Sequence, residues 1–370
     1  EEANRLNKDI ARHVKARFCL NEGTHYKYHD ELEYASEAEK WLQMAATESD
    51  KLITSGRYEI YNTGHPQEDY FNMYRIDDKS DLKEAVLYVD YKTNIREHNM
   101  AAAGREAGCG FSKSFVESFL CSDGLPISLS NKYLGDETMR KETANRDPRL
   151  KQLILTNDFP TNVTDDLKDS TFVVNEDEFI TQHCFTGYRP IKGFNPIYSQ
   201  ALYMKSSFDG IAYRYAETLL INAEAKAELN TITNADLDRT VNQLRDRVGM
   251  PHLTVNVGFT DPKWPDWGYS LSPVLQEIRR ERCIELAGEG FRFNDLKRWK
   301  AGKVLNNVLT YVGKRKPDGN LAIVYPNYTN PDLSYQAGKS RTWEDKMYLY
   351  PIPTGELQRN PQLLPQNPGW

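Results

Sequence analysis

Two helical segments separated by a four-residue turn stand out in the second half of the sequence. Residues 211–229 place small and apolar side chains at helical spacing, and residues 234–248 continue the pattern after a turn at residues 230–233. Gly249 and Pro251 end the second segment. The apolar face consists of Ala212, Tyr215, Ala216, Leu219, Leu220, Ala223, Ala227, Leu237, Val241, Leu244 and Val248. Because alanine at contact positions lets helices approach closely, this pattern predicts a helical hairpin of the tetratricopeptide type.

The N-terminal part of the sequence predicts a second hairpin. Residues 1–20 form one predicted helix, which we expect Asn21-Glu22-Gly23 to end. Residues 35–55 form the other, and Gly56 fits a cap at its C-terminal end. The two hairpins are fewer than a free-standing helical-repeat protein needs, so we expect other segments or loops to cover their exposed faces.

The remaining sequence combines short helices with long irregular stretches. Ser272 and Pro273 are favoured residues for a helix start, and we expect a helix from there to about residues 280–287, with a shorter one after Gly290. Residues 84–89 and 347–352 resemble short strands. The irregular stretches, rich in Gly, Pro, Asn, Asp and Tyr, are residues 104–210, 250–270 and 312–350. The fold class is therefore mainly all-α: a tetratricopeptide-like helical-repeat scaffold with long irregular loops and minor β structure.

The composition argues against a disordered chain, a nucleic-acid-binding protein and a protein with membrane-spanning helices. The 370 residues are 39% hydrophobic and 27% charged, which argues against disorder. The net charge is −6, whereas a nucleic-acid-binding domain usually carries a basic patch. The only tight basic cluster, residues 314–316, reads as a turn with a solvated rim, so we expect no nucleic-acid partner. No apolar run is long enough for a membrane-spanning helix.

Metal and cofactor sites are not indicated either. The cysteines Cys19, Cys109, Cys121, Cys184 and Cys283 show no CxxC spacing, so we expect buried free thiols and no structural zinc. The histidines lack zinc-like spacing, and His25 and His29 fall in a predicted loop. Residues 77–81 lack the glycine and terminal glutamate of a calcium loop. We expect no metal and no cofactor.

The densest charge cluster allows two interpretations. Glu281, Glu285 and Glu289 follow one helical face, with Asp295 nearby in the sequence, and paired carboxylates can hydrolyse glycosides. Alternatively, Glu277, Glu281 and Glu285 form ion pairs with the neighbouring arginines Arg279, Arg280, Arg282 and Arg292. Arg282 and Glu285 interrupt an apolar stripe, and charges there are costly unless they are paired. This argument favours a structural ion network.

Three loops carry aromatic platforms beside polar side chains, a combination that suits sugars because their C–H faces stack on rings while their hydroxyls bind amides and charges. They are residues 91–105, residues 259–269 and residues 325–335. We predict that Tyr91, Asn94, Arg96, His98, Asn99, Trp264, Trp267 and Tyr328 contact a ligand, with the first loop as the leading candidate. The alternative is that these aromatic side chains are lids over the core.

Several stretches, in one consistent order, resemble the SusD/RagB family over the whole chain. They are Ser122–Ile127, Asn145–Leu150, Tyr213–Glu217 with Asn222–Ala225, Val241–Arg245, Glu277–Arg282 with Glu285–Leu286, Glu289–Arg292, Asp295–Trp299, and the ending with Tyr350–Pro353, Asn360–Pro361 and Gln366–Trp370. The resemblance implies that the family's N-terminal part, with its lipoprotein cysteine and first helical repeats, is absent. The division it implies is a single domain, residues 1–370. Within it, residues 1–75 form a helical-repeat hairpin, 76–210 a loop-rich ligand or partner region, and 211–370 the C-terminal SusD/RagB region.

The resemblance also implies a function. Such proteins are surface-exposed, lipid-anchored subunits on the outer membrane that capture oligosaccharides, or sometimes peptides, for a SusC-like TonB-dependent transporter. We therefore expect a binding protein and no enzyme. Two alternatives stay open: a glycoside hydrolase using Glu281, Glu285 or Asp295, and a helical-repeat scaffold without a small ligand.

Overall fold

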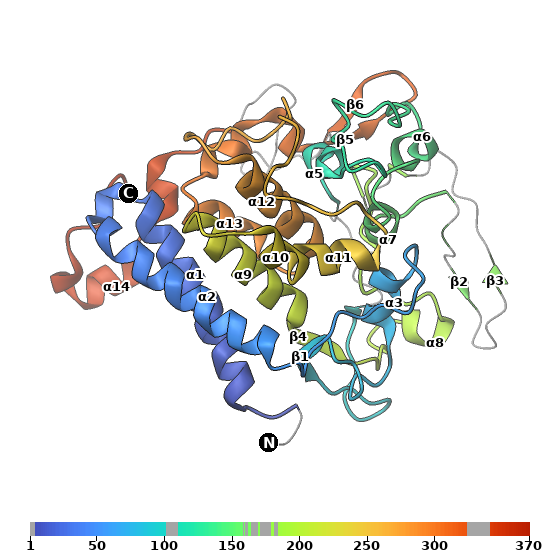
Figure 1. Cartoon of the computed structure of the whole chain (residues 1–370), viewed down its shortest axis with the longest axis horizontal. Coiled ribbons are helices and arrows are strands. Elements are labelled where there is room, and N and C mark those ends of the chain that lie inside the picture. Colours follow the sequence, from blue (N-terminus) through green and yellow to red (C-terminus); the bar gives the residue numbers. More distant parts are fainter. Residues whose placement is uncertain are drawn as a thin grey trace.

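The computed structural model describes residues 4–100, 110–157, 159, 162–163, 169–170, 179–180, 184–323 and 341–370. The helices are α1 (Lys8–Tyr28), α2 (Ala38–Thr54), α3 (Asp69–Arg75), α5 (Lys113–Ser118), α6 (Met139–Thr143), α7 (Arg149–Leu153), α8 (Tyr198–Ala201), α9 (Tyr215–Glu228), α10 (Asn234–Asp238), α11 (Val241–Arg247), α12 (Pro273–Glu285), α13 (Arg292–Arg298) and α14 (Thr354–Arg359). The antiparallel strand pairs are β1 (Ala85–Val89) with β4 (Gly210–Arg214), β2 (Asn162–Val163) with β3 (Asp169–Ser170), and β5 (Val312–Arg315) with β6 (Leu321–Ile323). This mainly helical architecture confirms the predicted fold class (Figure 1).

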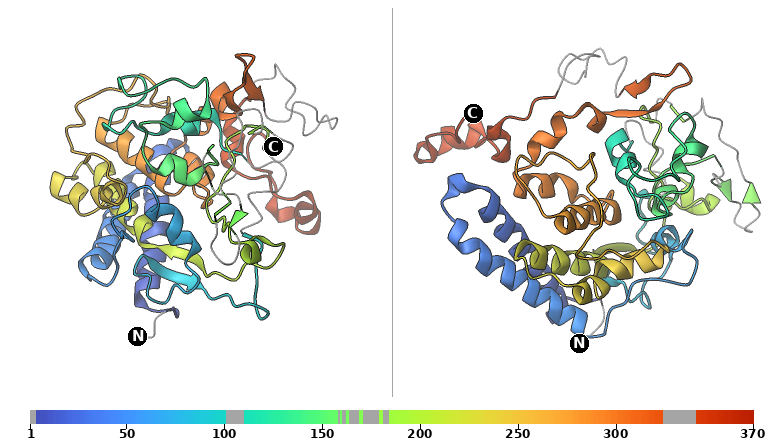
Figure 2. Two further views of the ribbon diagram at one scale, coloured as in Figure 1. Left: turned by 90° about the vertical axis from the view of Figure 1, so that its right-hand side faces the viewer. Right: turned by 45° about the horizontal axis from the view of Figure 1, so that its top comes forward.

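Helices α1 and α2 form the N-terminal hairpin and lie side by side (Figures 1 and 2). The prediction that Gly23 ends α1 is wrong, because the helix continues to Tyr28. A Cβ atom on Gly23 would lie 2.8 Å from Cγ of Leu42 in α2, so the glycine permits a close helix crossing. His25 therefore lies in a helix and not in the predicted loop, and its ring stacks on His29 at 4.0 Å.

Helix α9 extends the hairpin into a three-helix layer, because it packs on α2. Small side chains and three larger aliphatic ones fill this interface: Ala16, Cys19, Leu20, Leu42, Ala45, Ala46, Ile221 and Ala225. The predicted helix at 211–229 begins later than expected, since residues 210–214 form β4. The predicted helix at 234–248 is divided at Thr240, whose hydroxyl donates to the carbonyl of Asp236 at 2.6 Å and competes with the helical ladder.

Helix α12 packs on α9 and starts as predicted. The side chain of Ser272 accepts a hydrogen bond from the backbone N–H of Leu275, and Pro273 occupies the first turn. Apolar side chains of α9, α11 and α12 share one core cluster, which includes Leu219, Leu244 and Ile278. Helix α12 is thus held at the centre of the molecule, with its charged side chains also buried.

Two other local predictions are wrong. Residues 345–348 form a short 3₁₀ helix and not a strand; Tyr348 is buried, and its hydroxyl accepts from the backbone N–H of Gly302 at 2.9 Å. The prediction of a solvated turn at 314–316 is wrong for Lys314, which is 1% exposed within β5, whereas Lys316 begins a turn in which its carbonyl accepts from the N–H of Gly319 at 2.9 Å. Arg315 pairs with Asp136 at 2.9 Å.

Three cysteines, Cys19, Cys121 and Cys184, are buried and free as predicted, while Cys283 is half-buried. Cys109 lies outside the described residues. Within the described part of the chain, no helix combines the length and apolarity that crossing a bilayer requires.

Candidate functional site

The family-like motifs of the sequence converge on one buried ion network around α12. Glu285 accepts hydrogen bonds from Arg149 Nη1 at 3.0 Å, Arg214 Nη1 at 2.6 Å and Arg247 Nη2 at 2.6 Å. Glu281 pairs with Arg149 and, at 3.1 Å, with Arg245. These partners are distant in sequence, so the network joins α7, β4, α11 and α12 into one rigid unit.

The network supports the structural interpretation of the carboxylates, with different partners from those expected. Only the Glu277–Arg280 pair, at 3.1 Å, joins neighbours as predicted. Arg279 pairs with Glu228 and Arg282 with Asp295, each at 2.9 Å. Local helical spacing could not reveal these partners, since they come from other elements.

The electrostatics of Glu285 do not suit a general acid. Burial, the largest influence, raises its pKa, but the guanidinium groups of Arg247, Arg214 and Arg149 outweigh burial and hold the pKa well below its ordinary value. A glycosidase acid needs a raised pKa. Burial also raises the pKa of Asp295, but Arg282 and Arg298 outweigh burial and lower it. The arginines favour the charged form of both carboxylates, which in turn anchor the arginines.

Two cavities flank α12 and α13. We call the first the Arg214 cavity; it has a volume of about 710 Å³, and Arg282, Asp295 and Arg298 line it. We call the second the Trp264 cavity; it has a volume of about 590 Å³, and Arg279 and Leu296 line it. Both volumes suit a small ligand or a short piece of a polymer. Glu281 and Glu285 line neither cavity.

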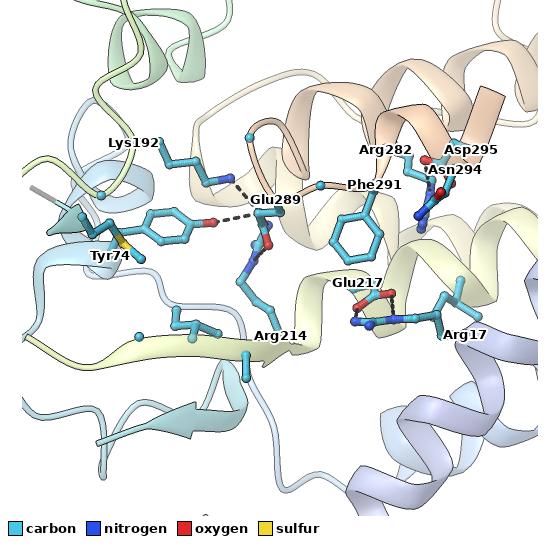
Figure 3. Close-up of a pocket in the computed structure, with 18 of the residues that line it drawn as sticks. Arg17, Tyr74, Lys192, Arg214, Glu217, Arg282, Glu289, Phe291, Asn294 and Asp295 are labelled. Atoms are coloured by element: carbon cyan, nitrogen blue, oxygen red, sulfur yellow. Dashed lines mark hydrogen bonds and ion pairs between the residues drawn. The ribbon is translucent and has the colours of Figure 1, made fainter. Parts of the chain in front are cut away.

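One end of the Arg214 cavity is a tight polar cluster (Figure 3). Glu289 accepts from Arg214 Nη2 at 2.6 Å, from Lys192 Nζ at 2.7 Å and from the hydroxyl of Tyr74 at 3.1 Å. Burial lowers the pKa of Lys192 to about 8, against the opposing effect of Glu289. Each of these charges already has a protein partner, so this end offers few free groups to a ligand.

The other end of the Arg214 cavity is equally saturated. The guanidinium of Arg17 binds Glu217 and lies 5.0 Å from the ring centroid of Phe291 (Figure 3). Burial raises the pKa of Glu217, but His13 and Arg17 outweigh it and lower the value to about 2. Arg282 binds Asp295 at 2.9 Å. This cavity is therefore walled by an ion network whose charges satisfy one another.

The Trp264 cavity has a different character, because indole rings and uncommitted polar groups line it. Trp264 is half-buried, and its Nε1 donates to Glu277 Oε1 at 2.8 Å, which fixes the orientation of the ring. Trp267 is 5% exposed, donates to Gln276 Oε1 at 2.6 Å and packs edge-on against Trp299 at 5.5 Å. Trp264 can thus present a ring face, while Trp267 mainly belongs to the wall and core.

The predicted residues of the first loop gather in a separate cluster. The ring centroids of Tyr91 and His98 are 4.4 Å apart, and the guanidinium carbon of Arg96 lies 5.0 Å from the Tyr91 centroid. His98 Nε2 lies 2.9 Å from the carbonyl of Phe208. None of these side chains lines either cavity, although Met100 at the end of the described loop borders the Arg214 cavity.

Asn94 and Asn99 have evident structural roles in that loop. Asn94 adopts a left-handed conformation with φ +61°, which asparagine tolerates well, and donates its N–H to Glu97 at 3.1 Å. The side chain of Asn99 accepts from the backbone N–H of Met204 at 3.0 Å. Tyr328 lies outside the described residues. The structure therefore does not bring the predicted ligand residues together into one cavity.

Sequence reasoning missed several residues of the Trp264 cavity, including Phe115, Arg292, Lys303 and Asn307. Phe115 and Asn307 carried no signal, because only the tertiary fold brings α5 and the segment after α13 to the indole rings. Arg292 was assigned to an ion pair, yet no carboxylate pairs with it among the described residues; its location in a motif was the available signal. The described residues contain no cluster of potential metal ligands.

Comparison with known proteins identifies similar chains. The SusD family model matches residues 47–370. SusD-like protein P2 of Formosa agariphila is 32% identical over 166 residues, which is 45% of this chain and 27% of that protein. A SusD-like protein of Bacteroides fragilis has a TM-score of 0.68 at 24% identity, covering 100% of this chain and 66% of that one. A SusD-like carbohydrate binding protein of the same species has a TM-score of 0.64 at 23% identity, covering 98% and 66%. The chain thus spans just under two thirds of these solved structures and about a quarter of the curated relative.

Proposed function

The chain belongs to the SusD family, and from this premise we propose that it is a surface subunit that captures oligosaccharides and does not hydrolyse them. Membership over residues 47–370 is the observation that carries the proposal. The name of a structural neighbour, a SusD-like carbohydrate binding protein, supports a glycan as the ligand in preference to a peptide.

The chemistry of the Trp264 cavity supports the same ligand class. The Trp264 ring has its edge fixed by Glu277, so a sugar can stack on its face without first ordering the side chain. The amide nitrogens of Gln276 and Asn307 on the cavity wall can donate to sugar hydroxyls, while their oxygens accept from Trp267 and from the backbone of Leu309. Tyr91, Arg96 and His98 form a second candidate contact for a longer chain.

The burial and arginine pairing of the carboxylates on α12 oppose a hydrolytic role. Glu281 and Glu285 are 2% and 0% exposed, and arginines occupy their oxygens. A hydrolase needs one carboxylate to carry a proton to the leaving oxygen, and the strongly lowered pKa of Glu285 opposes this. Asp295 lines the Arg214 cavity but is bound by two arginines.

We further propose the cellular setting that such a subunit requires. The protein delivers its ligand to a SusC-like TonB-dependent transporter and is held at the outer membrane by a lipid anchor outside this chain. This part of the proposal rests on family membership. Co-purification of the transporter with the tagged protein from membranes tests it, and recovery of the protein without any such barrel contradicts it.

Affinity electrophoresis tests the ligand class. The purified chain is run through gels that contain single neutral or acidic polysaccharides, and peptide mixtures are titrated separately. We expect retardation by at least one polysaccharide and no binding to peptides. Binding to peptides alone would replace the ligand class, and binding to neither would leave the scaffold interpretation in place of ours.

A further inference from the structure

The two cavities differ in how their cationic side chains are satisfied. In the Arg214 cavity, every cation has a protein partner among the described residues. Arg17 pairs with Glu217, Arg214 with Glu285, Arg282 with Asp295, Arg298 with Glu224, Lys192 with Glu289, and Lys79 donates to the carbonyl of Ile76. The cations of that cavity therefore already have partners within the fold, five of them carboxylates and one a carbonyl.

The Trp264 cavity contains two cations that have no partner among the described residues. Arg292 and Lys303 both line it, and neither makes a hydrogen bond or an ion pair within the described part of the chain. The other three cations of its wall are committed: Arg279 binds Glu228 at 2.9 Å, Arg280 binds Asp261 at 2.6 Å, and Lys263 binds Glu117 at 3.0 Å. Among the cations of this wall, only Arg292 and Lys303 therefore lack a partner in the described part of the chain.

The guanidinium of Arg292 lies beside two indole rings at the edge of the Trp264 cavity. It is half-buried, and its guanidinium carbon lies 5.8 Å from the centroid of Trp267 and 6.0 Å from that of Trp299. A guanidinium beside aromatic rings loses part of its hydration and keeps its planar set of donors, which matches the two oxygens of a carboxylate or sulfate. Among the described residues, every buried arginine makes a hydrogen bond or an ion pair, whereas this guanidinium at the edge of a cavity makes neither.

Acidic side chains in the same cavity do not provide the missing anion. Asp261 and Glu117 are bound to Arg280 and Lys263. Asp266 is exposed, and its Oδ1 accepts the backbone N–H of Gly268 at 2.9 Å. The wall therefore carries more positive than negative charge, although the whole chain has a net charge of −6. Attraction of a polyanion would have to come from this cavity and not from the protein as a whole.

We propose that the Trp264 cavity selects an acidic polysaccharide, with a carboxylate or sulfate group of the sugar bound by Arg292 and Lys303 while a sugar ring stacks on Trp264. This inference rests on the proposed glycan-binding function and narrows its substrate class. Carboxylate and sulfate both present anionic oxygens that accept hydrogen bonds from the N–H groups of a guanidinium and an ammonium.

Matched pairs of polysaccharides test the inference with the whole chain. Polygalacturonate is compared with its fully methyl-esterified form, and dextran sulfate with dextran, so that each pair separates charge from the sugar backbone. We expect the acidic member of at least one pair to bind about ten-fold or more tightly than its neutral counterpart, and the affinity to fall as salt is added. The pair that responds identifies carboxylate or sulfate.

Variants then place the effect in this cavity. Arg292→Gln and Lys303→Gln should each remove most of the acidic preference, Arg292→Lys should keep part of it, and Arg359→Gln on the exposed face of α14 should keep all of it. Lys303 is exposed and has no partner in the described part of the chain, so Lys303→Gln remains informative even if Arg292→Gln fails to fold.

Three outcomes overturn the inference. Equal affinity for both members of each pair overturns the substrate class while the glycan-binding function stands. An acidic preference that persists in Arg292→Gln and Lys303→Gln, or that falls equally in Arg359→Gln, overturns the site. Binding to no polysaccharide at all overturns the proposed function together with the inference.

Discussion

The Arg214 guanidinium lies 2.6 Å from a carboxylate oxygen of Glu285, across 71 residues of sequence and within a pair that is almost completely inaccessible to solvent. The same carboxylate binds Arg149 and Arg247. This contact joins the β1–β4 strand pair to α12, and α12 contributes a wall to both cavities. The ion network is thus the framework on which the candidate ligand site is built.

Glu285→Gln should destabilise the protein strongly, because three buried guanidinium groups lose their shared anion. We expect a loss of about 3–5 kcal/mol in the free energy of unfolding, which urea denaturation measures. Glu356→Gln provides the matched control, since its partner Arg359 is 79% exposed and the pair contributes little. Equal stability of the two variants would contradict the structural interpretation of the network.

Stability should also fall in acid through Glu217. Its pKa is lowered from 4.5 to about 2 in the folded state by His13 and Arg17, against the raising effect of burial. A lowered folded-state pKa gives stability that is present above about pH 4.5 and is lost as the pH falls toward 2, in total about 3 kcal/mol. Urea denaturation between pH 6 and pH 3 should show a shallower pH dependence for Glu217→Gln than for wild type. Glu59→Gln, on an exposed ion pair, should keep the wild-type dependence.

Two glycines in helices should respond in opposite ways to alanine. Gly23→Ala forces a Cβ atom against Leu42 and should cost about 1–3 kcal/mol, despite the better helix propensity of alanine. Gly355→Ala in α14 meets nothing within 4 Å and should be neutral or slightly stabilising. Thermal unfolding distinguishes these results, and an unchanged Tm for Gly23→Ala would show that α1 and α2 do not cross as closely as described.

Trp264→Ala should weaken polysaccharide binding about ten-fold by removing the stacking surface. Trp264→Phe keeps an aromatic face and should retain more of the affinity. Trp370→Ala is the matched control, because this indole is 47% exposed on the C-terminal segment and lines neither cavity. Calorimetric titration gives the three affinities, and a normal affinity for Trp264→Ala would place the sugar elsewhere.

The sequence predicted those features that depend on local spacing. The helical faces of α2, α9 and α12, the Ser272 cap and the strand β1 follow from periodicity and capping preferences. The end of α1 was misjudged, because Gly23 acts through contact with Leu42 and not as a helix terminator.

The candidate site was less accessible from sequence, because it depends on long-range contacts. That Glu285 needed a partner could be inferred from its place in an apolar stripe, but its binding of Arg149, Arg214 and Arg247 could not. Trp264 was identified as an aromatic residue of a loop, whereas Arg292 and Phe115 join it only when α13 and α5 are placed in space. Asn94 and Asn99 have roles in loop geometry that composition cannot distinguish from ligand contacts.

The central claim is that the protein binds a glycan and leaves it intact. The most direct measurement incubates the purified chain with the polysaccharide that it binds and determines both the bound fraction and the chain length of the sugar in the same samples. We predict binding with no shortening of the polysaccharide over time. Shortened products that disappear in Glu281→Gln, Glu285→Gln or Asp295→Asn, under conditions in which the variant remains folded, would contradict the account and identify a hydrolase.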